Sequence, residues 1–465
     1  MKYITGLLAA ACMMMVSCDD KLDYTPLGMS TLDTVSDLET LLNQPWYIFN
    51  GATSLEVLAN NTYPEKYKKV EAMLTNKNTI SYALLACDES VDRADLSTDD
   101  NIYDKLYEYI QYPNVIIAKA PEAEGDGKLR SEIIAESRVL RAWFHFLAVN
   151  IYAKQYDEST AATDGGVAYV DNINAQELKE KRTVAYVYQR ILEDCADEVI
   201  AAVPLRTGKT TWRGGADFAN AVRALVLFQM KHYDQALVYC NRALAINDVI
   251  EDRQESLSSG NWTVDYSHPN NYLHFRGTNT NLGEYSAYIL TPEASSKIEQ
   301  HDYLLTFSSE NGGWDRDSGY GLPGSYVSSA SGVQISSFGI RTENVIYTAA
   351  ECLIRTGHIK DGLAMVDRVR AKRVANAEPF AERTDITTEE QAMALLQDAK
   401  RVEMFTTCFN YLDCKRWNSE DKYRRTIIHD LGEKGTAELR PDSPLWIFPF
   451  PVSSVIHNPT LTPNY

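Results

Sequence analysis

The chain has 465 residues, of which 64 are acidic and 45 are basic, so its formal net charge at pH 7 is −19. This charge excludes nucleic acid as an expected partner, because phosphate backbones are bound through clusters of Lys and Arg. A hydrophobic fraction of 45%, with 28 Tyr and 7 Trp, indicates a folded globular protein with a substantial core.

The first eighteen residues have the layout of an export signal. Lys2 gives a basic start, residues 4–16 are almost wholly apolar, and Cys18 is followed by two aspartates. The apolar run is shorter than the ~20 residues of a membrane span, and an ordinary secretory signal ends in a small-residue site. The segment resembles bacterial lipoprotein signals, which are cut before a cysteine that then carries acyl chains. The resemblance implies a signal peptide over residues 1–17, a lipidated Cys18 and a tether over residues 18–32. A signal peptide that merely contains a cysteine is the alternative.

Helical periodicity dominates the segments that show a regular pattern. Residues 130–152 and 183–203 each place apolar side chains at helical spacing, and we expect one helix in each segment. Residues 218–246 indicate two helices joined by a tight turn at residues 231–233. We assign three aromatic residues of the first segment to the core: Trp143, Phe144 and Phe146.

Residues 344–373 repeat the helical hairpin of residues 218–246. Ala350 and Gly357 of the second copy align with Ala224 and Lys231 of the first. This pattern is near the tetratricopeptide signature. A single hairpin cannot bury its apolar face, so several must stack. We therefore predict a mostly α fold with a tetratricopeptide-like hairpin scaffold.

Residues 247–342 have a different character, because Gly, Ser, Asn and aromatic residues replace the helical period except near residues 292–299. This segment indicates loops, short strands and turns. Long irregular stretches in compact proteins are uncommon unless they are functional or disordered, and this one is too aromatic for disorder. We expect it to be an irregular ligand-binding insertion. Near the end of the chain, residues 446–451 indicate a short apolar strand.

Four stretches carry motifs that occur together in one family. Residues 135–152 begin AES and resemble the pattern AEA, apolar run, LRA and two aromatics, and residues 344–373 contain Y-x-x-A-E-x-L-x-x-x-G. Residues 403–417 keep the glutamate, the aspartate and the final Arg-Trp of a third pattern but not its central E-G-x-R, and residues 448–465 form a proline-rich ending. Together they resemble the SusD/RagB family of outer-membrane lipoproteins from the Bacteroidetes.

The resemblance implies a single domain over residues 33–465, with an N-terminal part over about 33–246 and a loop-rich C-terminal part over about 247–465. It implies a glycan-binding lipoprotein, anchored by lipid in the outer membrane at the cell surface. Such a protein captures oligosaccharides and delivers them to a partner TonB-dependent, SusC-like transporter. Alternatives are the same scaffold binding peptides or another nutrient, a lipid-anchored glycan hydrolase, and a structural assembly lipoprotein.

Aromatic faces that pack on sugar rings, with charged groups on the hydroxyls, are the chemistry that such binding needs. The loop around Trp314 is the best candidate for it. Asp88, Glu89 and Arg93, which resemble an acidic stretch of the family, form a second. The alternatives are that the aromatic rings pack the loop onto the helices and that Asp88 caps a helix. The predicted ligand-binding residues are Trp262, Asn311, Trp314, Asp315, Arg316, Tyr320, Asp88 and Arg93.

Motifs of catalysis are lacking. Residues 208–210 suggest a phosphate loop, but Val203 stands at the first-glycine position and a helix precedes it. Asp315 and Asp317 are neighbours in one loop and seldom flank a sugar as a glycosidase pair does. The sequence contains neither GxSxG nor HExxH. We therefore expect no enzyme activity, no cofactor and no metal.

Overall fold

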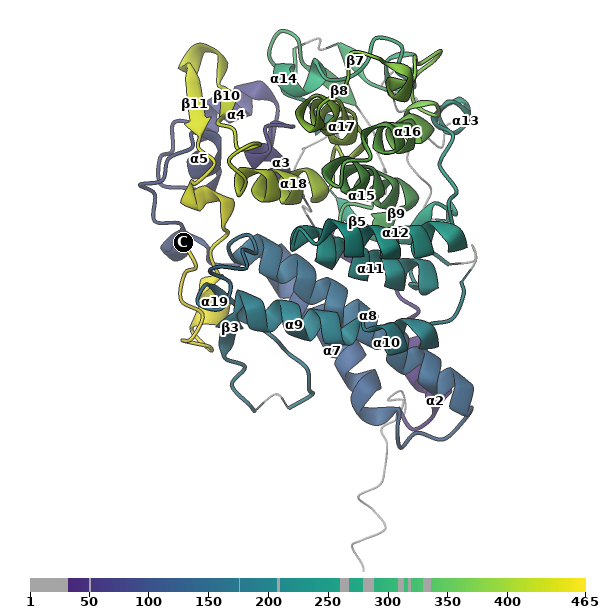
Figure 1. Cartoon of the computed structure of the whole chain (residues 1–465). Coiled ribbons are helices and arrows are strands. Elements are labelled where there is room, and N and C mark those ends of the chain that lie inside the picture. The colour runs from purple at the N-terminus through teal and green to yellow at the C-terminus, as the bar shows by residue number, and fades with distance from the viewer. Residues whose placement is uncertain are drawn as a thin grey trace, which may run out of the picture.

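A stack of helical hairpins forms most of the fold (Figure 1). The structure, a computed structural model, describes residues 32–49, 52–174, 176–206, 210–259, 267–278, 288–307, 313–316, 319–328 and 336–465. The helices are α2 (Val35–Thr40), α3 (Thr53–Leu58), α4 (Tyr67–Met73), α5 (Ile80–Leu85), α6 (Arg93–Leu96), α7 (Asn101–Lys119), α8 (Gly127–Tyr152), α9 (Val184–Asp194), α10 (Asp197–Ala202), α11 (Ala216–Gln229), α12 (Tyr233–Ile246), α13 (Arg253–Ser258), α14 (Pro292–Ser295), α15 (Thr342–Arg355), α16 (Ile359–Arg370), α17 (Glu389–Glu403), α18 (Phe409–Asn418) and α19 (Val452–Val455). The strands are β1 (Trp46–Phe49), β2 (Gly165–Ala168), β3 (Lys181–Thr183), β4 (Asn271–Leu273), β5 (Phe275–Thr278), β6 (Tyr288–Ile289), β7 (Asp315–Arg316), β8 (Tyr326–Ser328), β9 (Ile340–Arg341), β10 (Ile427–Asp430) and β11 (Thr436–Leu439).

Neighbouring helices pack on one another in chain order. Helix α7 packs on α8, α8 on α9, and α11 on α12, which in turn contacts α15. Helix α15 then packs on both α16 and α17. In Figure 1 this stack runs from α7 to α9 at the bottom up to α16 and α17 at the top right. The predicted mostly α, tetratricopeptide-like scaffold is confirmed.

The two predicted repeat hairpins are α11 with α12 and α15 with α16. Both turns need one residue in the left-handed region, namely Lys231 at φ 63° and Gly357 at φ 88°. Glycine adopts this conformation without steric cost, whereas another residue does so at about 1–2 kcal/mol. Within the second hairpin, a Cβ on Gly362 would lie 2.6 Å from Cγ1 of Ile354. Only a glycine therefore allows these two helices to pack so closely.

The single helix expected over residues 183–203 is wrong, because the segment forms α9 and α10 with a break at Cys195 and Ala196. The guanidinium of Arg223 on α11 donates to the carbonyl oxygens of Leu192 and Cys195 at 3.0 and 2.9 Å. Arg223 thus satisfies the last carbonyl groups of α9. In a continuous helix these carbonyl groups would accept hydrogen bonds from amides of the next turn.

The predicted core residues of α8 are buried. Trp143, Phe144 and Phe146 are each at most 1% exposed. The Trp143 ring stacks on Phe146 with 5.3 Å between centroids, and its Nε1 donates to the carbonyl oxygen of Phe338. One hydrophobic cluster that includes these rings extends from Val35 to Leu461. The core therefore involves both ends of the described chain.

Within its described residues, the segment 247–342 contains short strands and turns, as expected, with α13 and α14 as its helices. Strand β5 pairs in parallel with β1, so that Trp46 faces Phe275, and β4 pairs with β9. Strand β8 lies between β6 and β7. These pairings tie the segment to the start of the chain and to the start of α15.

The apolar strand expected over residues 446–451 is wrong. Residues 444–446 form a 3-10 helix, and the rest is extended without a strand partner. Pro449 and Pro451 lack the N–H groups that a ladder needs, and the amide of Phe448 donates instead to the carbonyl oxygen of Ile151. Phe448 and Phe450 are buried, so the segment contributes to the core as an extended chain.

Glu403, at the end of α17, is enclosed by three arginines. Its carboxylate lies 2.7 Å from Nε of Arg373, 2.9 Å from Nη2 of Arg253 and 3.3 Å from Nη1 of Arg341. Burial alone raises the pKa of Glu403, but the three cations outweigh it and hold that pKa well below the ordinary 4.5. Arg373 also binds Glu343 at 2.9 Å. This Glu403 cluster joins α13, α15 and α17 at one buried point.

A second buried network joins α15, α17 and α18. Arg416 is fully buried and binds Glu351 through two hydrogen bonds of 2.6 and 2.8 Å. The Nε1 of Trp417 donates to the same carboxylate at 3.0 Å. Asp413 accepts from Arg416 and pairs with Lys400 at 2.7 Å. The conspicuous Glu351, Asp413 and Arg416-Trp417 of the sequence motifs are therefore internal structural partners.

Replacing Glu403 with Gln is expected to lower the free energy of unfolding by about 3–5 kcal/mol, because it leaves buried arginine charge uncompensated. The measurement is urea unfolding followed by tryptophan fluorescence. The matched control is Glu108→Gln, which breaks an exposed pair with Lys105 and should change the unfolding free energy by less than about 1 kcal/mol. Equal effects of the two variants would contradict a structural role for the Glu403 cluster.

Candidate functional site

Trp314, the centre of the predicted loop site, is 6% exposed. It belongs to a small hydrophobic cluster with Leu290, Leu304 and Phe405, and its ring centroid is 6.4 Å from that of Phe405. Its amide donates to the carbonyl oxygen of Leu304 at 2.7 Å. Stacking on a sugar requires a ring that is open to solvent, and the Trp314 ring is not. The structure favours the packing interpretation, in which this ring holds the loop on the helices.

The other predicted residues of this loop are placed differently. Asp315 and Arg316 form β7 and are exposed. Tyr320 is half-buried, with Nζ of Lys66 4.5 Å from its ring centroid. None of these three residues lines either of the two cavities considered below. Their role in binding stays a prediction. Two further candidates, Asn311 and Trp262, lie outside the described residues.

Asp88 and Arg93, the second candidate pair, have separate roles. The carboxylate of Asp88 accepts hydrogen bonds from the amide and the hydroxyl of Ser90 at 2.9 and 2.6 Å, which closes a turn. The N-cap of α6 is Asp92, so the alternative capping role does not belong to Asp88. Arg93 is only 3% exposed and binds carbonyl groups of the C-terminal segment.

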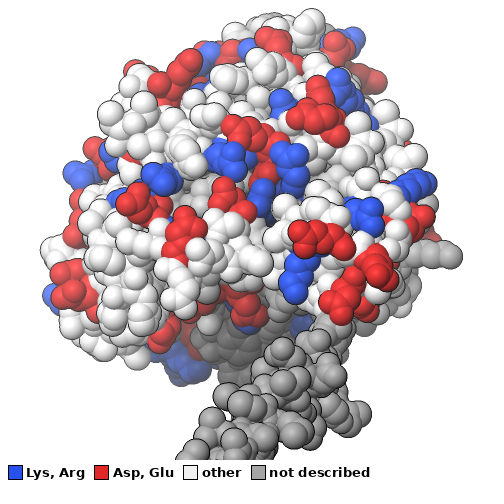
Figure 2. Space-filling model, turned by 90° about the horizontal axis from the view of Figure 1, so that it is seen from below, with Lys and Arg blue, Asp and Glu red and all other residues white. Residues whose placement is uncertain are grey.

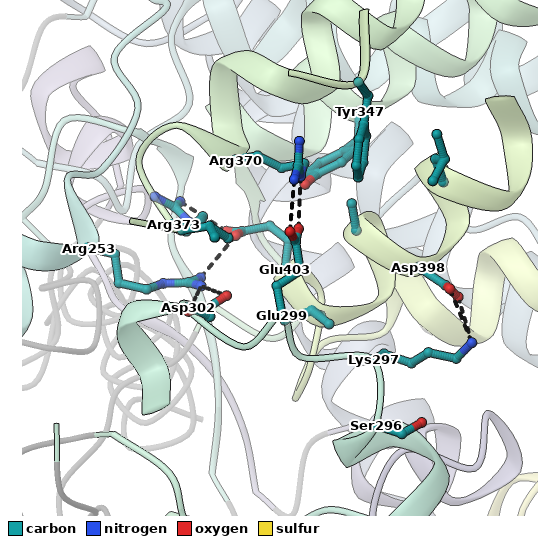
Figure 3. Close-up of a pocket in the computed structure, with 15 residues that line it drawn as sticks. Arg253, Ser296, Lys297, Glu299, Asp302, Tyr347, Arg370, Arg373, Asp398 and Glu403 are labelled. Carbon is teal, nitrogen blue, oxygen red and sulfur yellow. Dashed lines mark hydrogen bonds and ion pairs between the residues drawn. The ribbon is translucent and has the colours of Figure 1, made fainter. Parts of the chain in front are cut away.

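A cavity of about 300 Å³ lies between the loop-rich segment and helices α16 and α17 (Figure 3). We call it the ion-pair cavity. Arg370 binds Glu299 at 2.8 Å and Lys297 binds Asp398 at 3.0 Å, while the Glu403 cluster forms part of the wall. Each charged side chain that lines the cavity is paired with another described side chain. A ligand would therefore have to compete with existing ion pairs for every charge.

A second cavity, of about 390 Å³, lies where α8 and α18 end. We call it the α18 cavity. Its volume falls within the range of about 300–1,000 Å³ that is usual for small-molecule sites. Neutral amides, hydroxyls, prolines and two aromatic rings predominate in its lining, which consists of Lys154, Gln155, Lys415, Asn418, Ser419, Pro441, Asp442, Ser443, Pro444, Trp446, Ile447 and Tyr465.

Arg93 positions the aromatic and apolar wall of the α18 cavity. It donates to the carbonyl oxygens of Ile447 and Pro444, both at 2.9 Å, and its guanidinium carbon lies 4.4 Å from the ring centroid of Tyr465. Trp446 is fixed through its Nε1, which donates to the carbonyl oxygen of Arg440. The Tyr465 side of the wall stays accessible, because that residue is 40% exposed. The predicted residue Arg93 thus supports a cavity without lining it.

Two buried amide atoms at the α18 cavity have no hydrogen-bond partner among the described residues: Oε1 of Gln155 and Nδ2 of Asn418. The other end of the Gln155 amide donates to the carbonyl oxygen of Gln229 at 2.8 Å, which fixes its orientation. Such buried polar atoms are uncommon in native proteins and are costly unless a ligand or water satisfies them. They are one acceptor and one donor in this part of the lining that no described group satisfies.

The α18 cavity carries one carboxylate, Asp442, among its lining residues. Glycoside hydrolysis ordinarily uses two carboxyl groups on either side of the scissile bond. Among the described residues, no group of His, Cys, Asp and Glu side chains is arranged to hold a metal ion. The arrangement therefore suits binding through an aromatic face and hydrogen bonds.

One face of the molecule carries side chains of both charges. On the face seen from below in Figure 2, basic and acidic side chains are interspersed. Among the helices that the structure describes, none is both long and apolar enough to cross a bilayer.

The sequence motifs do not predict the α18 cavity, although several of its lining residues lie within them. Lys415 lies inside the 403–417 motif, and Trp446 and Tyr465 lie in the segments at the end of the chain. These motifs indicate a fold and do not by themselves indicate a cavity. The cavity forms because the fold brings residues 154, 415, 442 and 465 together. An aromatic residue next to several prolines was the available signal.

Comparisons with known proteins agree with this fold. Residues 20–213 match the family model SusD-like_3, described as "Starch-binding associating with outer membrane". No curated protein sequence matches the chain.

Several solved structures are similar over almost the whole chain. A SusD-like carbohydrate binding protein from Bacteroides vulgatus ATCC 8482 shares 14% identity and a TM-score of 0.64, with 93% of this chain and 98% of that chain covered. A SusD superfamily protein from Bacteroides thetaiotaomicron VPI-5482 shares 13% identity and a TM-score of 0.63, covering 93% and 100%. A SusD-like carbohydrate binding protein from Bacteroides fragilis NCTC 9343 shares 15% identity and a TM-score of 0.63, covering 92% and 99%. Residues 20–213 are thus similar to a SusD-like family, and the chain has the fold of SusD-like proteins over nearly its whole length.

Proposed function

We propose that this protein is a glycan-binding lipoprotein that captures oligosaccharides at the cell surface and delivers them to a partner TonB-dependent, SusC-like transporter. The observation that carries the proposal is the α18 cavity, where a partly exposed aromatic face adjoins two buried amide atoms without partners. Sugars present both C–H faces and hydroxyls, so this combination matches their chemistry. The description of the family model as starch-binding supports the same class of ligand.

The proposal is for a binding protein without catalytic activity. A single carboxylate in the α18 cavity supports it, because the common glycosidase mechanisms need two. The ion-pair cavity is a poorer candidate for a catalytic centre, because its carboxylates, such as Glu299 and Glu403, are held by arginines.

We further propose the arrangement at the membrane. Residues 1–17 are a signal peptide, Cys18 is lipidated, residues 18–32 are a tether, and residues 33–465 form one domain with parts over about 33–246 and 247–465. The family description, "associating with outer membrane", supports this location. The stacked hairpins offer broad faces for a transporter, since such faces are the usual binding surfaces of helical repeats.

Tyr465→Ala is expected to weaken oligosaccharide binding about 5- to 30-fold, because it removes the accessible aromatic face of the α18 cavity. A glycan array that includes maltooligosaccharides identifies the ligand, and isothermal titration calorimetry measures its affinity. The matched control is Tyr186→Ala. Tyr186 is also 40% exposed and also lies against an arginine, Arg182, but it lies on α9 outside the cavity.

Unchanged affinity in Tyr465→Ala, together with a loss in Asp315→Ala, would assign binding to the loop around β7 instead of the α18 cavity. New reducing ends released from a bound glycan would overturn the proposal that the protein has no catalytic activity.

Cys18→Ala is expected to abolish incorporation of radiolabelled palmitate and release the protein from the outer membrane, because a stable anchor needs more than one acyl chain on this residue. Protease added to intact cells should degrade the natural protein, and the transporter should copurify with it from solubilised membranes. Cys87→Ala serves as the control and should retain the label. Full labelling of Cys18→Ala, or protection of the natural protein from protease, would contradict the proposed anchor or location.

A further inference from the structure

Lys415, on α18, is a buried cation that lines the α18 cavity. Its Nζ donates to the carbonyl oxygens of Asn150 and Ala153, the latter at 2.7 Å. An ammonium group has three N–H donors, so one remains after these two bonds. The side chain is 5% exposed, which places this charge almost entirely out of solvent.

No carboxylate among the described residues forms an ion pair with Lys415, and burial lowers its pKa to about 7. Its two carbonyl partners belong to the C-terminal end of α8. A helix end carries the equivalent of about half a negative charge. The helix end therefore compensates part of the positive charge of Lys415, and the rest of that charge has no anionic partner among the described residues.

The other charges around Lys415 do not supply the missing anion. Lys154 pairs with Asp164 at 2.9 Å, and Asp442 lies 3.6 Å from Arg440 on the exposed rim. The ring of Tyr411 lies beneath Nζ at 5.4 Å. Across the cavity, Tyr465 lies against Arg93, which is a further cation. The side chains of the lining therefore include two lysines and one carboxylate, although the whole chain is strongly acidic.

We propose that the α18 cavity takes an acidic saccharide, one that bears a uronate-type carboxylate, and that Lys415 binds this carboxylate through its remaining N–H. The inference rests on the proposed glycan-binding function and names the class of glycan. The carboxylate completes an ion pair with the buried ammonium, and charge-assisted hydrogen bonds are the stronger kind. The amides of Gln155 and Asn418 bind sugar hydroxyls beside it.

The test uses two probes that differ only in carrying a carboxylate or a hydroxymethyl group: digalacturonic acid and galactobiose of the same linkage. Titration calorimetry of the purified protein at pH 7 should show digalacturonate binding about ten- to a hundredfold more tightly. When digalacturonate binds, the protein should also take up about half a proton per site, because a lysine with a pKa near 7 is half neutral before binding. Two buffers of different ionisation enthalpy measure this uptake, which galactobiose should lack.

Three variants separate recognition from folding. Lys415→Met should reduce digalacturonate affinity to that of galactobiose, and Lys415→Arg should keep the preference without proton uptake, because arginine stays charged. Lys154→Met should retain the uptake. Above pH 7 the affinity of the natural protein for digalacturonate should fall, because Lys415 loses its proton, whereas that of Lys415→Arg should not. If the Met variant does not fold, proton uptake by the natural protein still decides the question.

The outcomes distinguish this inference from the proposed function. Equal binding of both saccharides, or tighter digalacturonate binding without proton uptake, would overturn the role of Lys415 and leave glycan binding intact. Binding of an acidic peptide, with no saccharide bound, would overturn both.

Discussion

The arrangement of the C-terminal helices depends on one interaction, the buried ion pair between Glu351 and Arg416. The carboxylate of Glu351 binds Arg416 and Trp417 at once, and through Arg416 and Asp413 it reaches Lys400. Buried ion pairs of this kind cost much to break and give little net stability compared with an apolar core. Their effect here is to fix where α18 lies on α15 and α17. The Glu403 cluster does the same for the junction of α17 with the loop-rich segment.

The α18 cavity follows from this fixed position. Lys415, Asn418 and Ser419 lie at the end of α18, within one turn of the Glu351 network, and face the end of α8. Arg93 then ties residues 444–447 and Tyr465 to the other side. A cavity built on such contacts is preorganised, so ligand binding needs little ordering of the chain. The same contacts explain why polar atoms can remain without partners there, since the surrounding structure holds them in place.

Sequence patterns predicted the parts of the fold that depend on local spacing. The hairpin register is local, and the left-handed turns at Lys231 and Gly357 confirm it. Errors arose where distant contacts decide the outcome. Arg223 binds the carbonyl groups that end α9, and the segment at residues 446–451 packs on α8 without a strand partner. The glycines and serines beside Trp314 predict an exposed ring, but Phe405, far away in the sequence, packs near it in one buried cluster. Of the predicted site residues that the structure describes, Arg93 supports the α18 cavity, because the fold brings it to residue 465.

The most direct test of the account is a crystal structure of the protein soaked with the tightest-binding oligosaccharide from the array. The account predicts a sugar ring against Tyr465, with its hydroxyls on the Gln155 and Asn418 amides and an acidic group next to Lys415. Saccharide density confined to the loop around residues 313–328, with the α18 cavity empty, would contradict it.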